Sequence, residues 1–180
     1  MSLGDQKNPA RILLFTGDGK GKTTAALGMA LRASGHRQRV FLLQVIKDNS
    51  STGELVGCSH LPGVQILQTG RGFIPEPESP SFSEHRRAAE EGLTLAGKAL
   101  KSQQYELVVL DEVCTAVARR LLTEEGVMEV IRMAAPETCV VLTGRKATPG
   151  LISLADTITE MRCIKHGFTS GRKAQKGVEY

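Results

Sequence analysis

The sequence predicts an α/β fold, a three-layer sandwich in which helices cover both faces of a mostly parallel sheet of five or six strands. Three observations favour it. Short apolar runs recur along the chain with helical segments between them, an alternation that selects crossover connections and a parallel sheet. The runs are nearly continuous in apolar residues, as in strands covered on both faces. The length of 180 residues suits a single domain.

The strands expected from these runs are short and carry few polar side chains. They are Ile12–Phe15, Val40–Ile46, Val64–Leu67, Leu107–Leu110 and Cys139–Thr143, with Asp156–Met161 as a weaker sixth strand. A strand with one face in water would alternate apolar and polar residues instead. We therefore expect helices on both faces of the sheet.

Three segments between the strands have apolar residues at helical spacing. Lys22–Ser34 is followed by Gly35, which is suited to end a helix because glycine adopts left-handed backbone angles without strain. Phe82–Lys101 repeats apolar residues at helical intervals. Glu124–Ala134 is followed by Pro136, which disfavours helix in the residue before it. These three segments are the expected helices.

The remaining segments define the domain organisation. Lys47–Gly63 is rich in Ser and Gly, and Thr69–Pro80 holds two Gly and three Pro, so both are expected to be long loops. Residues 1–10 are expected to be a disordered N-terminal segment or a remnant of cloning. Residues 11–161 are expected to form the α/β domain, with the basic C-terminal tail 162–180 as part of the same domain.

Composition excludes several classes of protein. Lys and Arg number 23 against 19 Asp and Glu, a net charge of +4 that suits an anionic ligand without requiring nucleic acid. No apolar run approaches the roughly 20 residues of a membrane span, and the polar N-terminus does not read as a signal peptide. None of the four cysteines lies within three residues of another. We expect a cytoplasmic protein with reduced cysteines and with no membrane or nucleic-acid partner.

The most informative segment follows the first expected strand and begins the first helix. It reads Thr16, Gly17, Asp18, Gly19, Lys20, Gly21, Lys22, Thr23 and Thr24. Its glycines allow several N–H groups to converge on one anion, and the helix N-terminus adds roughly half a positive charge. Lys22 would reach the terminal phosphates of a nucleotide, and the Thr23 hydroxyl would take a Mg²⁺ position. The sequence therefore predicts a P-loop, RecA-like sandwich that binds a nucleoside triphosphate.

A second candidate element is the strand Leu107–Leu110, which ends in Asp111 and Glu112. Ligands of open α/β sheets bind outside the carboxyl ends of the strands, so both carboxylates would lie near the phosphate loop. There they can hold Mg²⁺ or its water ligands together with Thr23. The alternative is an acidic pair that only stabilises the start of a helix.

Further short motifs follow the strand ends in order along nearly the whole chain. They are Gln44–Lys47, Gly53–Glu54, Gly70–Phe73, Thr143–Arg145, Ala155–Met161, Lys165–His166 and Ala174–Tyr180. Together with the phosphate loop and Asp111–Glu112, this series resembles the ATP:corrinoid adenosyltransferases of cobalamin salvage and synthesis. The phosphate loop of that family also carries its first glycine one position later than the usual pattern, as Gly17 does here.

The resemblance implies that ATP and a reduced corrinoid, cob(I)alamin or a precursor, are the substrates. Cobalt(I) attacks the 5′ carbon of ATP and the triphosphate leaves, so the phosphate loop holds the leaving group and no general base is needed. The catalytic residues are then Lys22, Thr23 and Glu112, the metal ligands Thr23, Asp111 and Glu112, and the ATP contacts Gly17–Thr24 and Arg145. Arg32 of the first helix could also approach the nucleotide, although a solvent-facing position is the more usual one. A homodimer and an electron-donating reductase are expected as well.

The corrin side departs from the family pattern. Family members commonly read Gly-Phe-Thr-Trp in the loop after the third strand, where the aromatic pair packs on the lower corrin face. Here Phe73 keeps its place, whereas Pro75 stands where the family has Trp. Phe73 and Pro75 are the expected corrin contacts. Val45 in place of Phe and Asp48 in place of Gly are further changes in loops expected to touch the corrin.

Two other functions stay open from the residues themselves. One is a RecA-like ATPase or switch driven by nucleic acid or a protein partner, which the basic residues of 162–176 favour. The scarcity of aromatic residues disfavours it, because single-stranded nucleic acid is usually bound on aromatic side chains. The other is an ATP-binding regulator without transferase activity, which the altered corrin loop would suit.

Overall fold

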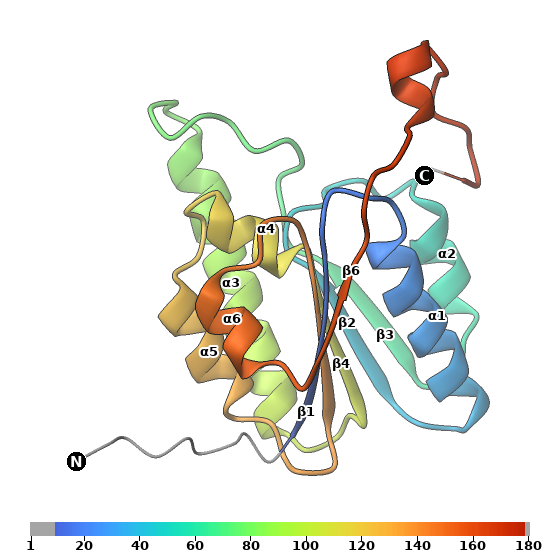
Figure 1. The fold of residues 1–180 in the computed structure, drawn as a ribbon. Helices are drawn as coiled ribbons and strands as arrows, with labels where there is room; N and C mark the ends of the chain where they lie inside the picture. The colour runs from blue at the N-terminus through green and yellow to red at the C-terminus, as the bar shows by residue number, and fades with distance from the viewer. Residues whose placement is uncertain (1–9, 179–180) are drawn as a thin grey trace.

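The structure, a computed structural model, describes residues 10–178. Its centre is a six-stranded sheet in the order β3-β2-β4-β5-β1-β6, with every neighbouring pair of strands parallel (Figure 1). The strands are β1 (Arg11–Thr16), β2 (Val40–Gln44), β3 (Val64–Gln68), β4 (Leu107–Asp111), β5 (Cys139–Thr143) and β6 (Thr157–Glu160). The expected α/β sandwich is confirmed, with six strands in an entirely parallel sheet.

Helices cover both faces of this sheet. They are α1 (Lys22–Gly35), α2 (Gly53–Ser59), α3 (Phe82–Lys101), α4 (Val113–Ala118), α5 (Glu124–Ile131) and α6 (Pro149–Leu154), and a short 3-10 helix, η1 (Gly167–Ser170), follows β6. The helices α1 and α2 lie on one side, and α3, α4, α5 and α6 on the other (Figure 1). No helix among residues 10–178 is long and apolar enough to cross a membrane.

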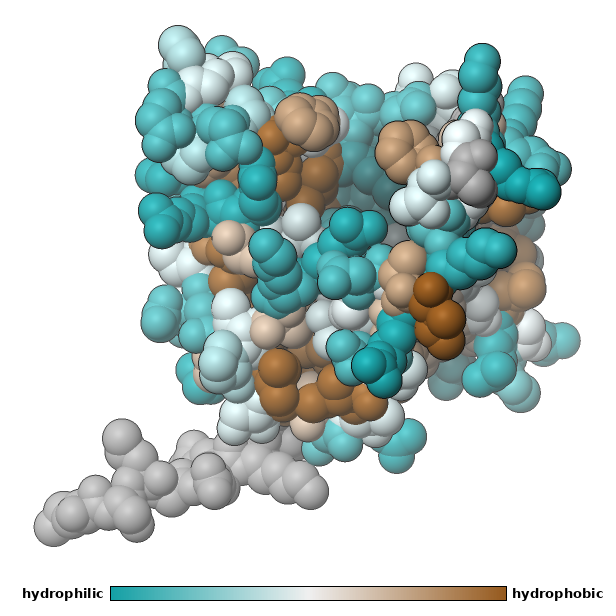
Figure 2. All heavy atoms as spheres, turned by 45° about the horizontal axis from the view of Figure 1, so that its top comes forward, coloured by the Kyte–Doolittle hydropathy of each residue, from teal (hydrophilic) through white to brown (hydrophobic). Residues whose placement is uncertain are grey.

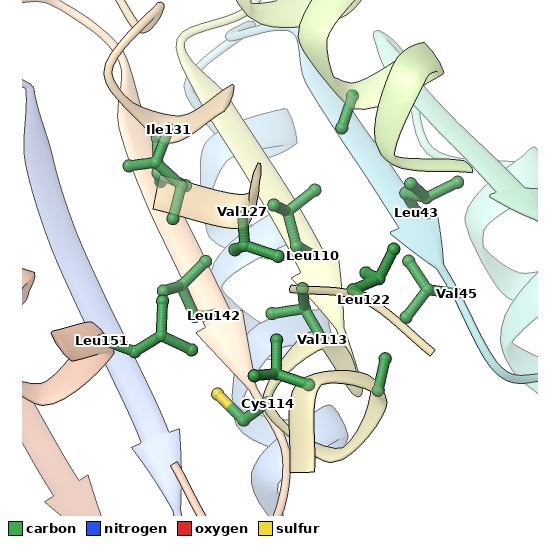
Figure 3. Packing of buried hydrophobic residues seen from close by; sticks show 14 of the residues in the cluster. Leu43, Val45, Leu110, Val113, Cys114, Leu122, Val127, Ile131, Leu142 and Leu151 are labelled. Atoms are coloured by element: carbon green, nitrogen blue, oxygen red, sulfur yellow. The ribbon is translucent and has the colours of Figure 1, made fainter. Parts of the chain in front are cut away.

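The side chains of β2 explain why the strands read as continuous apolar runs. Val40 and Leu42 pack with the alanines of α1, whereas Phe41 and Leu43 belong to the cluster under α3. Successive side chains of a strand point to opposite faces, so both sets are buried only when helices cover both faces. The larger cluster fills the space under α3, α4, α5 and α6 with mainly aliphatic side chains (Figure 3).

The expected strands and helices are present, with their ends shifted by a few residues. The weak sixth strand is confirmed but is confined to Thr157–Glu160, and the helix expected over Glu124–Ala134 ends at Ile131. The expectation of a loop over Lys47–Gly63 is wrong in part, because this segment contains α2. That helix buries only Cys58, so it leaves no apolar periodicity in the sequence and instead packs beside β3. The helices α4 and α6 are six residues each, too short for periodicity to reveal them.

All loops that follow a strand leave the sheet at the same end, the carboxyl end of the strands, because the strands run in the same direction. The phosphate loop follows β1 at this end of the sheet, and Asp111 ends β4 there. The chain from residue 162 onward leaves β6 at the same end and forms η1 (Figure 1). Of the expected N-terminal segment 1–10, residues 1–9 lie outside the described residues.

Candidate active site

The phosphate loop lies between β1 and α1 and packs against the end of β6. Its backbone takes left-handed angles at Gly17 and Gly21, with φ of 95° and 108°. The N–H of Gly19 donates to the carbonyl oxygen of Met161 at 2.6 Å, and the N–H of Met161 donates to Thr16 at 2.8 Å. A Cβ atom added to Gly17 or Gly19 would lie 2.5 or 2.7 Å from the Met161 oxygen. These two glycines, expected for anion binding, are therefore also required by the close approach of Met161.

Lys22, the first residue of α1, folds back over this loop. Its side chain is buried, and its ammonium group donates to the carbonyl oxygens of Gly17 and Gly19 at 2.8 and 2.5 Å. Burial lowers the pKa of Lys22; Glu112 opposes this shift and Arg145 reinforces it. The charges of Glu112 and Arg145 both act on the Lys22 ammonium group.

The carboxylate of Asp111 joins the phosphate loop to the sheet. Asp111 is fully buried at the end of β4. Its Oδ1 accepts a hydrogen bond from the Thr23 hydroxyl at 2.8 Å and another from the Thr143 hydroxyl at 2.7 Å. Thr143 ends β5, the strand between β4 and β1. The structure brings Thr23 and Asp111 together as the sequence predicts.

Glu112 follows in a left-handed backbone conformation, with φ of 62°. Such angles cost a non-glycine residue about 1–2 kcal/mol and concentrate at functional sites. Its N–H donates to the Thr143 hydroxyl at 2.8 Å, and its carboxylate accepts a hydrogen bond from the Thr115 hydroxyl. The same Thr115 oxygen accepts the N–H of Arg145 at 2.9 Å. Thr115 of α4 thus ties Glu112 to the loop that carries Arg145.

The oxygen atoms of Thr23, Asp111 and Glu112 suit a hard cation. Mg²⁺ prefers oxygen ligands and is usually bound through one or two carboxylates, with phosphate oxygens and water completing its shell. Within residues 10–178, no group of three or more His, Cys, Asp or Glu side chains gathers to hold a metal without such help. The chemistry of these oxygen donors fits Mg²⁺ whose shell phosphate and water oxygens complete.

The loop after β3 forms one side of a hollow at the same end of the sheet. The N–H of Gly72 donates to the Ile46 carbonyl oxygen at 2.8 Å, and the Arg119 guanidinium donates to the Ile74 carbonyl oxygen at 3.3 Å. Between these anchors the side chain of Phe73 is 93% exposed. Figure 2 shows hydrophobic side chains on both sides of a hollow at this end of the molecule. An apolar ring held out on an anchored loop can pack against a flat apolar ligand.

The sequence matches the ATP:corrinoid adenosyltransferases BtuR/CobO/CobP over residues 8–180. The chain belongs to this family. A corrinoid adenosyltransferase of Pseudomonas aeruginosa is 39% identical over 170 residues, which are 94% of this chain and 83% of that protein. The corrinoid adenosyltransferase CobA of Salmonella typhimurium is 36% identical over 176 residues, 97% of this chain and 88% of that protein.

A solved structure with the same fold is the flagellar accessory protein FlaH of Methanocaldococcus jannaschii. Its TM-score is 0.56 over 86% of this chain and 71% of that one, at 9% sequence identity. At that identity the likeness shows the fold alone. Function comes from the family, whose members are adenosyltransferases, and neither alternative function gains support from these comparisons.

Most residues expected in the adenosyltransferase site lie together, and Arg32 does not. Arg32 is exposed and lines a pocket with Arg11 and Cys139 at the opposite end of the sheet, where β1 and β5 begin. An α-helix rises 1.5 Å per residue, so Arg32 lies about 15 Å along α1 from Lys22. Its usual role as a solvent-facing residue holds. On the corrin side, Pro75 is half-buried beside the exposed Phe73.

Three polar residues of the site are given no contact in the sequence-based prediction, although Gln44 and Thr143 begin two of the motifs that carry the resemblance. Thr143 and Gln44 end β5 and β2, and both are fully buried. Thr115 lies on α4, a helix that the sequence does not reveal. The available signal for the first two is a polar residue at the carboxyl end of an otherwise apolar strand, which is where open α/β sheets bind ligands.

Proposed function

We propose that this enzyme transfers the 5′-deoxyadenosyl group of ATP to the cobalt of a reduced corrinoid and releases triphosphate. The observation that carries the proposal is the meeting of Lys22, Thr23 and Asp111 at the phosphate loop, in a member of the ATP:corrinoid adenosyltransferase family. Gly17–Thr24 would bind the triphosphate. Arg145, whose charge acts on Lys22, would add a second cation.

This reaction requires the protein to stabilise negative charge and requires no proton transfer. The electron pair of cobalt(I) forms a bond to C5′ of ATP while the bond from C5′ to the triphosphate oxygen breaks, so negative charge collects on the leaving group. Lys22 and the N–H groups of the loop are placed to stabilise that charge. Lys22 would exchange the carbonyl oxygens of Gly17 and Gly19 for phosphate oxygens, because hydrogen bonds between charged partners are the stronger ones. Cobalt(I) carries no proton to be removed, so the site needs no general base.

Thr23, Asp111 and Glu112 would hold Mg²⁺ with the nucleotide. When bound, this ion neutralises part of the triphosphate charge. The hydroxyl groups of Thr143 and Thr115 donate to the carboxylates of Asp111 and Glu112 and hold them in place, and the Thr23 hydroxyl donates to Asp111. Such outer contacts orient metal ligands and tune their affinity.

The corrinoid would bind at the hollow beside the loop after β3, with Phe73 and Pro75 as contacts. An electron-donating reductase would supply cobalt(I), the reactive form of this substrate. We also propose that the enzyme is a homodimer and acts in the cytoplasm. The free state of all four cysteines agrees with a reducing compartment.

One assay tests the proposed reaction. The protein is incubated with ATP, Mg²⁺ and chemically reduced cobalamin, the cobalt–carbon bond is followed by absorbance, and triphosphate is measured. Equal amounts of adenosylcobalamin and triphosphate are expected. ADP and orthophosphate formed without corrinoid would identify an ATPase or switch, and bound ATP with neither product would identify a regulator. Either of those results would overturn the proposal.

A further inference from the structure

A hydrogen-bonded row of polar side chains crosses the carboxyl ends of four strands. Its members are Gln68 of β3, Gln44 of β2, Asp111 of β4 and Thr143 of β5. In the register of the sheet, Gln44 lies opposite Gln68 on one side and opposite Asp111 on the other, so the sheet itself fixes the spacing of these three residues. The row ends at Thr23 of the phosphate loop, which donates to the same Asp111 oxygen as Thr143 does.

Gln44 is the centre of this row and is fully buried. Its Nε2 donates to Oδ2 of Asp111 at 3.0 Å and to Oε1 of Glu54 at 3.3 Å, while its Oε1 accepts a hydrogen bond from Gln68 at 2.8 Å. Ionised carboxylates only accept hydrogen bonds, so the amino end of the amide has to face them. The side chain therefore has one orientation, because turning it would leave buried polar groups unpaired.

Lys47 offers Asp111 a competing partner. Its ammonium group lies 2.6 Å from Oε1 of Glu54 and 4.0 Å from Oδ2 of Asp111. Burial would raise the pKa of Glu54, but the hydrogen bond from Lys47 and its charge hold that pKa below the ordinary value. Glu54 is therefore ionised and retains Lys47. The Gln44 amide occupies Oδ2 of Asp111, so Oδ1 accepts the hydrogen bonds from the Thr23 and Thr143 hydroxyl groups.

We propose that Gln44 is a positioning residue for the adenosyl transfer: together with Glu54, it keeps the Asp111 carboxylate turned toward Thr23 and limits its ion pair with the Lys47 ammonium to a long contact of 4.0 Å. The inference rests on the proposed function, in which Asp111 and Thr23 serve the triphosphate and its Mg²⁺. Without the amide, the ion pair between the Asp111 carboxylate and the Lys47 ammonium, now 4.0 Å long, can close to hydrogen-bond distance. A carboxylate paired in this way attracts Mg²⁺ less strongly, because the ammonium charge opposes the approach of a second cation.

The test compares Gln44→Met with Gln65→Met. The first variant keeps the approximate size of the side chain and removes the amide. The second removes a glutamine of β3 whose hydrogen bond partner is the Tyr105 hydroxyl. Equilibrium binding of a fluorescent ATP analogue is titrated with Mg²⁺ in the absence of corrinoid. Gln44→Met should raise the Mg²⁺ concentration for half-maximal binding about tenfold or more, as removal of a partner of a metal ligand typically does, and Gln65→Met should leave it unchanged.

A rescue separates positioning from packing. Lys47→Met added to Gln44→Met removes the competing ammonium group and should reverse most of the increase in Mg²⁺ requirement. If Gln44→Met does not fold, Glu54→Gln takes its place, because it weakens the hold on Lys47 and should raise the Mg²⁺ requirement in the same direction. An unchanged requirement in the variant used, or no reversal by Lys47→Met, would overturn the proposal. Because binding is measured without corrinoid, a wild-type enzyme that failed the transfer assay would refute the proposed function and leave this result readable.

Discussion

The hydroxyl group of Thr23 donates a hydrogen bond to the carboxylate of Asp111 at 2.8 Å, although 88 positions separate the two residues in the chain. Thr23 stands in the first turn of α1, and Asp111 ends β4, which is separated from β1 by β5. The Thr143 hydroxyl of β5 bonds to the same carboxylate oxygen. This hydrogen bond therefore connects the start of α1, directly after the phosphate loop, to the carboxylate proposed to serve Mg²⁺.

Replacing Lys22 should remove activity without unfolding the protein. In Lys22→Ala the triphosphate loses its compact buried cation, and kcat/KM should fall by about 100-fold or more, as for other groups that stabilise developing charge. The adenosylcobalamin assay measures this change. Lys101→Ala, at the exposed end of α3, is the matched control and should retain full activity. A Lys22→Ala enzyme within tenfold of the parent would contradict the proposed role.

Two glycine-to-alanine changes should act in opposite directions on stability. Gly19→Ala places a Cβ atom 2.7 Å from the Met161 carbonyl oxygen, so the free energy of unfolding should fall by about 1–3 kcal/mol. Gly28→Ala, inside α1, meets no atom within 4 Å and should raise it by about 0.5–1 kcal/mol, because alanine favours helix over glycine. Urea denaturation measures both. Equal effects of the two changes would show that the packing of Met161 against the loop does not constrain residue 19.

The charge of Asp111 should set the Mg²⁺ requirement. Asp111→Asn keeps an oxygen that can accept from Thr23 and Thr143 but removes the negative charge, so the Mg²⁺ needed for half-maximal ATP binding should rise about tenfold or more. Titration of nucleotide binding with Mg²⁺, and with EDTA in its place, measures this requirement. Asp48→Asn, at an exposed position, should leave it unchanged. The metal role would be untenable if both variants bound ATP with the Mg²⁺ dependence of the parent.

The loop after β3 should affect the corrinoid and not ATP. Phe73 is 93% exposed, so Phe73→Ala should change the free energy of unfolding by less than about 0.5 kcal/mol. It should raise the KM for cobalamin and leave the affinity for ATP unchanged. Pro75→Trp, which restores the aromatic residue of the family, should improve turnover. Steady-state kinetics with each substrate varied test both changes, and altered ATP affinity with unaltered cobalamin KM would refute this assignment.

The cysteines should differ sharply in their reactivity toward thiol reagents. Burial, reinforced by Glu112, raises the pKa of Cys114 to about 12, so only about one in ten thousand of these thiols is ionised at pH 8. Cys163 is exposed and should react rapidly with an aromatic disulfide reagent at that pH. Cys163→Ser should remove the fast phase, and the Cys114 signal should develop only on unfolding. Raising the pH to 9 should leave Cys114 unreactive, since that pH is still far below its pKa.

The sequence alone determined the layered α/β fold and the phosphate loop, because both depend on residues that are neighbours in the chain. Strands covered on both faces have to be apolar throughout, and the Gly17–Thr24 segment stands directly between β1 and α1. The apolar run that precedes Asp111 and Glu112 in the sequence also placed these two residues at the end of a strand. It could not reveal α2, whose seven residues bury only Cys58 and pack beside β3.

Only the tertiary structure decided which polar side chains meet. The strand order puts β5 between β1 and β4, and thereby makes Thr143 a partner of Asp111 and Glu112. The sheet register places Gln44 beside Asp111. The direction of α1 places Arg32 at the opposite end of the sheet, where β1 and β5 begin. Each of these outcomes depends on strand order, register or helix direction, which join residues far apart in sequence, and local patterns carry no information on such pairings.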